Sequence, residues 1–238
     1  MAVSDDLLVT VAPVFLPRET RWVVGLDLGQ SSDPTAIAVL EHTRGVLDSN
    51  TPSNRHCGIE DIKQVPAERI DCRHLQRLEL GMSYPAVVQT VKDLLARPPL
   101  DGYDGIKPAQ LVIDETGVGR AVGDIFDEAG LKSVRVSITA GAEVTCVGKD
   151  RWHVSKSVLI STVDAMLHTG ELRFAAALTE AGAMRDELLD FRRHLGAAGR
   201  ATYQARTGKH DDLVLAVAIG CWWLRKPPVM GHVVLGGY

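Results

Sequence analysis

The chain has 238 residues, 45% of them apolar and 24% charged, which is ordinary for a globular protein that can build a buried core. Its formal net charge of −4 excludes binding to nucleic acid through overall positive charge, so any such binding requires a local basic patch. The four cysteines form no C-x-x-C pair, which argues against a zinc ribbon or a disulfide framework and favours a reducing compartment.

The N-terminal part of the chain predicts a short leader followed by a β-hairpin. Residues 1–20 are expected to be an extended leader, because two prolines exclude a helix. The apolar runs 21–29 and 35–42 predict strands, and the five residues between them favour an antiparallel hairpin. Residues 43–66 are polar and rich in turn formers, which predicts a surface insertion.

The rest of the chain alternates strands and helices. Helices are expected over 83–99, 118–130, 155–170, 178–195 and the apolar run that ends at 224. Strands are expected at the end of 69–80 and over 109–117, 133–139, 171–175 and 199–206. This order predicts one α/β domain over 21–226, with a mixed sheet, helices on both faces and a C-terminal tail over 227–238.

Two adjacent acids stand directly before the last helix, in "TGKHDDLVLAVAIGCWWL" (207–224). Asp211 and Asp212 have an ordinary interpretation, because an aspartate at a helix N-terminus caps free backbone N–H groups. The following run is apolar on every side, which predicts a buried helix and places both acids at the edge of the core. Charge is costly there unless a partner compensates it.

Other acids end predicted strands. Asp27 closes the first strand in "GLDLGQSSDPT", and Asp114 closes a later one in "LVIDETGVG". Asp33 lies in the turn after the first strand, where aspartate needs no special explanation. Ligands of α/β sheets bind outside strand ends, so acids from three elements can surround one point. Clustered carboxylates favour Mg²⁺ or Mn²⁺, and two ions roughly 3.5–4 Å apart can cleave a phosphodiester.

Three motifs together resemble the nuclease domain of phage large terminase subunits, in the ribonuclease H-like superfamily. They are "GLDLGQSSDPTAIAVLE", "LVIDETGVGRAV" and "HDDLVLAVAIGCWW", and the middle stretch "VSKSVLISTVDAMLHTGELRFA" is also similar. The resemblance covers most of residues 21–224. It implies a ribonuclease H-like mixed sheet and a metal-dependent DNA endonuclease that cuts concatemeric phage DNA during packaging.

The resemblance also implies roles for individual acids. Asp27 matches the first-strand ligand that bridges two Mg²⁺ or Mn²⁺ ions, and Asp114 matches the second ligand. The third ligand is Asp211 or Asp212, with Asp212 preferred. Asp33 matches a further acid near the metals in some members.

His210 either orients a metal ligand or the scissile phosphate, or is an ordinary loop histidine. The substrate implied by the family is double-stranded DNA. No G-x-x-x-x-G-K-[ST] phosphate loop occurs in the sequence, so the packaging ATPase is expected to be missing or on another chain, with a portal or small terminase as further partners. No apolar stretch reaches membrane-spanning length, and the N-terminus is a poor signal peptide. We therefore expect a cytoplasmic protein, in the host cytoplasm if phage-encoded, without membrane contact.

A basic stretch over 191–210 contains no acid. Its positions predicted to contact the DNA backbone are Arg192, Arg193, Arg200, Arg206 and Lys209. Lys156, at the start of a predicted helix, is unfavourable for the helix dipole and is a further candidate phosphate contact. A solvated loop with ordinary surface charges remains the alternative for the stretch.

Two other functions fit the same fold. One is a resolvase or another ribonuclease H-like nuclease that acts on branched or hybrid substrates. The other is a non-catalytic domain that binds DNA or the packaging motor. A sugar-kinase-like ATPase also uses a "DLG" strand turn, but it needs a second nucleotide-binding half for which this chain is too short.

Overall fold

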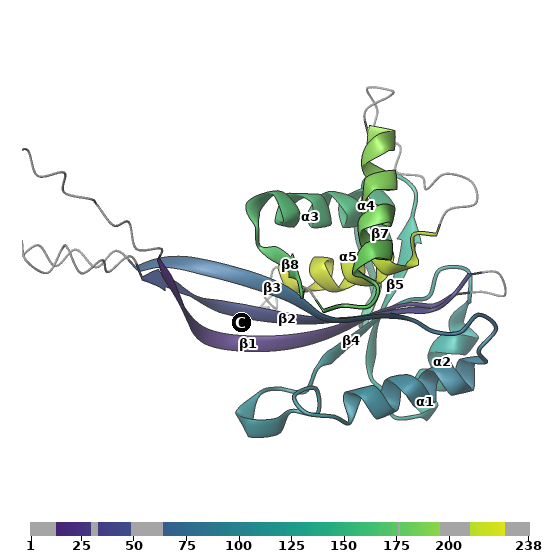
Figure 1. The fold of residues 1–238 in the computed structure, drawn as a ribbon. Helices are drawn as coiled ribbons and strands as arrows, with labels where there is room; N and C mark the ends of the chain where they lie inside the picture. Colours follow the sequence, from purple (N-terminus) through teal and green to yellow (C-terminus); the bar gives the residue numbers. More distant parts are fainter. Residues whose placement is uncertain (1–12, 30–32, 49–63, 176, 196–209, 227–238) are drawn as a thin grey trace, which may run out of the picture.

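The computed structural model describes residues 13–29, 33–48, 64–175, 177–195 and 210–226. Within these ranges the chain forms an eight-stranded sheet in the order β6-β7-β5-β4-β1-β2-β3-β8, with helices on both faces (Figure 1). The predicted α/β fold with a mixed sheet is confirmed. The strands are β1 Val14–Asp27, β2 Ala36–Asp48, β3 Gln64–Arg77, β4 Gln110–Asp114, β5 Ser133–Thr139, β6 Val144–Gly148, β7 Arg151–Ser155 and β8 Leu172–Phe174. The helices are α1 Tyr84–Leu95, the short η2 Tyr103–Gly105, α2 Arg120–Glu128, α3 Lys156–Thr169, α4 Ala181–Leu195 and α5 Asp212–Arg225.

The sheet separates two hydrophobic cores because successive residues of a strand point to opposite faces. In β1, Val23 packs into the core shared with α3, α4 and α5, whereas Val24 and Leu26 pack into the core shared with α1 and α2. Figure 1 shows α3, α4 and α5 on one face and α1 and α2 on the other. Asp27 follows Val23 by four residues, so it points to the face covered by α5.

Helix α5 lies on the middle of the sheet and is buried over almost its whole length. Two glycines permit this close packing. A β-carbon at Gly25 would lie 2.0 Å from the backbone oxygen of Ala216, and one at Gly220 would lie 2.7 Å from Leu40. The predicted buried helix is therefore confirmed, and its N-terminus is held above the ends of the central strands.

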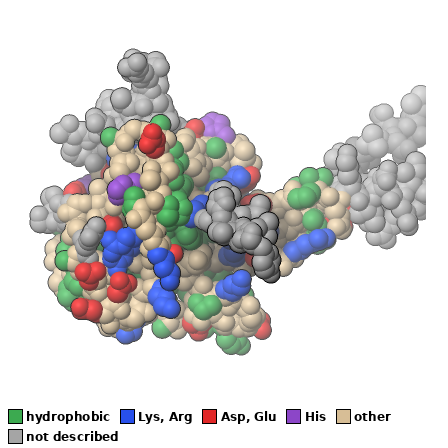
Figure 2. Space-filling view, turned by 180° about the vertical axis from the view of Figure 1, so that it is seen from behind, with side chains coloured by type: hydrophobic (Ala, Val, Ile, Leu, Met, Phe, Trp, Pro, Cys, Tyr) green, Lys and Arg blue, Asp and Glu red, His purple; other side chains and the backbone are tan. Residues whose placement is uncertain are grey.

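The first three strands are longer than the sequence predicted. They extend past the helices as a three-stranded ribbon (Figure 1), which projects from the body in the view of Figure 2. The expected leader boundary at residue 20 is wrong, because β1 begins at Val14. Pro17 is tolerated because it lies at a register shift in β1, on a stretch that pairs only with β2 and leaves its other edge open.

The expected insertion over 43–66 is likewise too long. Its first part continues β2 to Asp48 and its end begins β3 at Gln64, while residues 49–63 lie outside the description. Cross-strand pairing with β1 explains this result, since Val46 is paired with Leu16 and is buried although it lies in a stretch rich in polar residues and turn formers. The face of the molecule in Figure 2 carries both basic and acidic side chains, in agreement with the absence of an overall positive charge.

Most other predicted elements are confirmed within a few residues. The β6–β7 hairpin was not predicted, and both of its strands are only 5 residues long, with β6 exposed along its whole length. The strand expected over 199–206 lies outside the described residues. No helix in the described part of the chain is both long enough and apolar enough to cross a membrane.

Candidate metal centre

Four residues form a row across the ends of the central strands. Asp27 is paired in register with Asp114 of the parallel strand β4 and with Ala36 of the antiparallel strand β2. Ala36 is in turn paired with Arg77 at the end of β3. Directly paired residues share a face of the sheet, so the side chains of Asp114, Asp27 and Arg77 all point toward α5. Two acids that are 87 residues apart in the chain thus become neighbours.

The two strand-end acids share a strongly perturbed environment. Burial raises the pKa of Asp27 well above its usual range, and the nearby carboxylates of Asp114, Asp212 and Asp211 raise it further. Burial also raises the pKa of Asp114, although hydrogen bonds from Thr116 oppose this shift. A hydrogen bond between the two carboxyls raises the pKa of Asp27 and lowers that of Asp114. A divalent cation bound between the two carboxylates would relieve their mutual repulsion.

Thr116 fixes the carboxylate of Asp114. Its backbone N–H donates to Asp114 Oδ1 at 2.8 Å, and its hydroxyl donates to the same oxygen. The Thr116 hydroxyl oxygen also accepts from the backbone N–H of Ile138, at the end of β5, at 2.7 Å. The second carboxylate oxygen of Asp114 accepts neither of these hydrogen bonds. Thr116 therefore holds one oxygen of the carboxylate and leaves the other to different partners.

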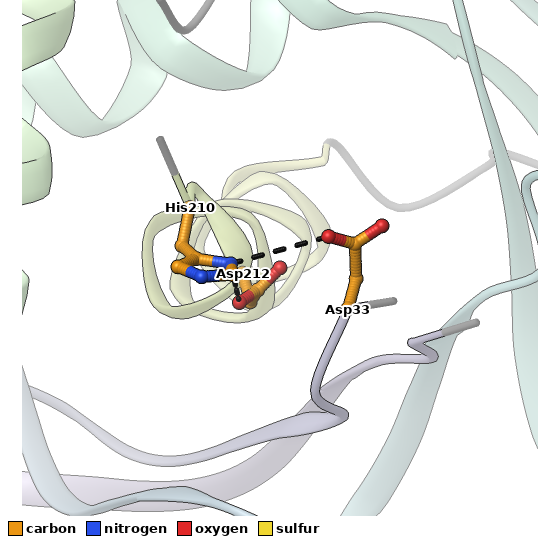
Figure 3. Close-up of side chains that lie close together, drawn as sticks. All are labelled: Asp33, His210 and Asp212. Carbon is orange, nitrogen blue, oxygen red and sulfur yellow. Dashed lines mark ion pairs between the residues drawn. The ribbon is translucent and has the colours of Figure 1, made fainter. Parts of the chain in front are cut away.

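A second group of ligand atoms gathers at the N-terminus of α5. Figure 3 shows Asp33, His210 and Asp212 converging from the loop after β1 and from the start of α5. One ligand atom of each lies within 4.8 Å of the others. His210 Nδ1 is 3.5 Å from Asp212 Oδ2 and 4.0 Å from Asp33 Oδ1. The tight turn that returns Asp33 requires Gly29, because a β-carbon there would lie 2.0 Å from the Asp33 carbonyl oxygen.

Asp212 is a buried acid without full compensation. It is the first residue of α5 and is 5% exposed. Burial raises its pKa, and His210 and Arg77 oppose the shift. Asp212 Oδ2 is buried and has no hydrogen-bond partner among the described residues, since Arg77 Nε is 3.6 Å away and His210 Nδ1 is 3.5 Å away. An oxygen in this state is suited to a cation ligand.

The neighbouring Asp211 has a different environment. It occupies the N-cap position of α5 but its side chain makes no capping hydrogen bond. Its Oδ2 instead contacts the ammonium of Lys156, the first residue of α3. The N–H of Val214, in the first turn of α5, donates to Glu187 Oε2 at 3.0 Å. The sequence allowed an aspartate to cap the N-terminus of α5. In the structure, Glu187 of α4 accepts the hydrogen bond from the first turn of the helix instead.

These residues fit divalent cations that prefer oxygen ligands. Three carboxylates with raised pKa values, Asp27, Asp114 and Asp212, lie at the strand ends and at the start of α5, and those of Asp114 and Asp212 both act electrostatically on Asp27. Carboxylate oxygens suit Mg²⁺ and Mn²⁺, and the imidazole of His210 favours Mn²⁺ over Mg²⁺.

The structure accounts for some of the other predicted positions. Arg192 and Arg193 lie in α4, but their side chains are outside the description, as are Arg200, Arg206 and Lys209 entirely. Arg77 and Thr116 contact the predicted acids Asp212 and Asp114, and Glu187 contacts Arg77 and the backbone of α5, but none of the three was predicted. Arg77 and Glu187 have no local signature in the sequence. Thr116 follows Asp114 by two residues, the spacing of an Asx turn, which could have signalled it.

The described residues form an α/β fold with a mixed eight-stranded sheet, and acids lie at the ends of its central strands. The nuclease of the large terminase from the thermophilic phage G20c superposes with a TM-score of 0.50 and 19% identity, covering 88% of this chain and 87% of that chain. The human cytomegalovirus terminase nuclease domain, in an Mn-soaked structure, superposes with a TM-score of 0.43 and 12% identity, covering 84% of this chain and 82% of that chain. The superposition on the phage G20c nuclease shows that the chain has a terminase nuclease-like fold. No protein-family profile and no curated protein sequence matches it.

Proposed function

We propose that the chain is a metal-dependent DNA endonuclease of the terminase type, which hydrolyses phosphodiester bonds with two Mg²⁺ or Mn²⁺ ions. The observation that carries the proposal is the in-register pairing of Asp27 with Asp114 beneath Asp212, on a terminase nuclease-like fold. Two such ions activate a water and stabilise the leaving oxygen when they are bound. The expected substrate is double-stranded DNA.

The environments of the acids support a division of roles. Asp27 interacts with both Asp114 and Asp212, which suits a ligand shared between two ions. Asp114 presents one oxygen while Thr116 holds the other. Asp212 is preferred over Asp211 as the third ligand, because Asp212 has a buried oxygen without a hydrogen bond whereas Asp211 is paired with Lys156.

Asp33 and His210 complete the outer side of the site. Their ligand atoms lie close enough to Asp212 to hold one ion jointly, so we assign Asp33 as a secondary ligand. His210 either joins that ion or orients Asp212 through the Nδ1 atom that faces it. Both residues are more than half exposed, so this side of the site is open to a substrate.

Contacts to the DNA backbone are assigned to basic residues near the acids. Lys156 lies at the site itself, where it contacts Asp211 and lowers the pKa of Asp114. The stretch from Arg192 to Lys209 leads directly into His210 and the start of α5. We assign phosphate contacts to Lys156 and to Arg192, Arg193, Arg200, Arg206 and Lys209. A packaging ATPase, missing from this sequence or on another chain, together with a portal or small terminase, would supply the packaging functions, and the nuclease domain is assigned to residues 14–226.

The central experiment compares Asp27→Asn with wild type in Mn²⁺ and Mg²⁺. We expect the variant to lose cleavage of linear and supercoiled duplex while it retains binding to DNA. The matched control is Asp93→Asn, which removes an exposed carboxylate from α1 on the opposite face of the sheet and should leave cleavage unchanged. A wild-type protein that binds DNA but cuts nothing in Mn²⁺ would instead support a non-catalytic DNA-binding or motor-binding domain.

A substrate panel separates the terminase type from the related nucleases. Cleavage of duplex DNA agrees with the proposal. Selective cutting of four-way junctions would assign the chain to the resolvases, and selective cutting of RNA–DNA hybrids would assign it to hybrid-specific nucleases.

A further inference from the structure

Glu187 is a buried acid that supports the start of α5 from a different helix. It lies on α4 and is 6% exposed. Its Oε2 accepts a hydrogen bond from the backbone N–H of Val214 at 3.0 Å. The first N–H groups of a helix have no partner within the helix, so this contact satisfies one of them and places a negative charge at the positive end of the helix dipole.

The other oxygen of Glu187 is held by Arg77. Arg77 Nη2 donates to Glu187 Oε1, and Arg77 Nη1 is 3.4 Å from Glu180 Oε2. Burial raises the pKa of Glu187 to about 7, and the Val214 N–H and Arg77 oppose the shift. The guanidinium therefore stabilises a charge that the protein interior disfavours.

The same guanidinium faces Asp212. Arg77 Nε is 3.6 Å from Asp212 Oδ2, and neither of these buried atoms has a hydrogen-bond partner among the described residues. Arg77 belongs to the row of residues that also holds Asp27 and Asp114. A chain of contacts thus runs from the sheet through Arg77 to Asp212, and through Glu187 to the backbone of the turn that carries Asp212.

We propose that Glu187 and Arg77 are positioning residues that fix Asp212 relative to Asp27 and Asp114. Glu187 holds the first turn of α5 in place of the capping aspartate, and Arg77 orients the Asp212 carboxylate while it neutralises Glu187. The inference rests on the proposed function, because it assigns to both residues a role toward the metal-binding acids. Residues that orient metal ligands typically change metal affinity by 10–100-fold when they are substituted.

The test measures Mn²⁺ affinity in the absence of DNA for Glu187→Ala and Glu187→Gln, by calorimetry or by the electron paramagnetic resonance signal of free Mn²⁺. The measurement is made at pH 8 and well below the Tm of each variant. Alanine removes the acceptor for the Val214 N–H, so we expect Mn²⁺ binding to weaken by roughly tenfold or more. Glutamine keeps a side-chain oxygen at the same place, so it should restore most of the affinity.

Arg77→Gln provides a test that separates positioning from charge. Removal of a cation near Asp212 would strengthen Mn²⁺ binding if only electrostatics mattered, whereas loss of positioning weakens it. We expect weaker binding. Tighter binding by Arg77→Gln, or equal affinities for wild type, Glu187→Ala and Glu187→Gln, would overturn the proposal.

A matched control is available on the same sheet. Asp71 of β3 is also a buried acid paired with arginines, Arg69 and Arg173, but it lies six residues from Arg77 along the strand. Asp71→Asn should lower the Tm without a change in Mn²⁺ affinity. A wild-type protein that binds no Mn²⁺ would overturn both this inference and the proposed function, while normal wild-type binding with unaffected variants would overturn the inference alone.

Discussion

Gly25 of β1 lies directly beneath the backbone carbonyl of Ala216 in α5, at a position where any side chain would occupy the space of the helix backbone. This relationship sets the height of α5 above the sheet. Because Asp27 lies two residues after Gly25 on the same face of β1, and Asp212 lies four residues before Ala216, the same contact sets the separation of two proposed metal ligands.

Gly25→Ala is accordingly expected to damage both stability and the site. The new β-carbon would lie 2.0 Å from the Ala216 oxygen, so β1 and α5 must separate, which should cost about 3 kcal/mol or more. Denaturant unfolding measures this loss, and Mn²⁺ binding to the folded fraction should weaken as well. Gly182→Ala in α4 is the control. It has open space around it and should stabilise the protein by about 0.5–1 kcal/mol. Equal stability of Gly25→Ala and wild type would contradict the packing described here.

The metal-free protein is expected to lose stability as the pH rises from about 4 toward neutrality. Burial raises the folded-state pKa of Asp27 well above its usual value of 3.8, and it raises that of Glu187 from 4.5 to about 7. In this window the unfolded chain releases these protons while the folded protein retains them, so stability is greatest below the unfolded pKa values and falls as the pH passes through the folded ones.

Thermal unfolding between pH 4.5 and 8 measures this slope. Mn²⁺ binds the ionised carboxylates, so its addition should raise the Tm most at the upper end of the range. Asp27→Asn removes one of the groups that hold a proton and should flatten the metal-free slope. A metal-free Tm that rises steadily from pH 5 to 8 would be inconsistent with buried, protonated acids at the site.

Lys156→Gln is expected to weaken the binding of DNA and to strengthen the binding of Mn²⁺. The substitution removes a proposed phosphate contact, so DNA binding should weaken and the slope of log affinity against log salt should decrease by about 1. It also removes a cation that acts on Asp211 and Asp114, so Mn²⁺ binding should become tighter. Lys92→Gln, on the exposed side of α1, is the control for a lost positive charge. A fall in both affinities would indicate a structural role for Lys156.

The basic stretch before α5 is expected to supply salt-dependent affinity. Replacement of Arg200, Arg206 and Lys209 by glutamine should weaken DNA binding for all duplex sequences alike and reduce the salt slope by roughly 3. Fluorescence anisotropy at several salt concentrations measures both quantities. A control triple variant at Lys92, Lys107 and Lys132 loses the same charge in or beside elements of the α1–α2 layer. If the salt dependence of DNA binding is unchanged in the first variant, this stretch is an ordinary surface loop that does not contact DNA.

Sequence reasoning identified the acids of the site because each carries a local anomaly. Asp27 and Asp114 follow buried apolar residues at strand ends, and Asp212 precedes a wholly apolar helix. The pairing of β1 with β4 then follows from the usual arrangement of such sheets. Glu187 has no such anomaly. It is one of several charges on an amphipathic helix, where most acids face solvent, and only the tertiary contact with Val214 distinguishes it.

Strand lengths were underestimated for a related reason. Pro17 of β1 and the polar residues of β1 and β2 indicate loops when they are considered locally, whereas the register between the strands keeps them extended. The β6–β7 hairpin was missed because its strands have only 5 residues each, which is too short for a clear periodic pattern, and β6 buries none of them. Sequence patterns therefore predicted the buried centre of the sheet well and its exposed margins poorly.

The division of the hydrophobic interior by the sheet has a consequence for how this protein can vary. Every described residue assigned to the metal centre lies at the strand ends or on the face covered by α3, α4 and α5, while Val87, Val91 and Phe126 fill the core beneath α1 and α2. The α1–α2 layer is therefore free to diverge or to be redesigned for thermal robustness with little effect on the chemistry above it. On the opposite side even a single methyl group, at Gly25, is excluded.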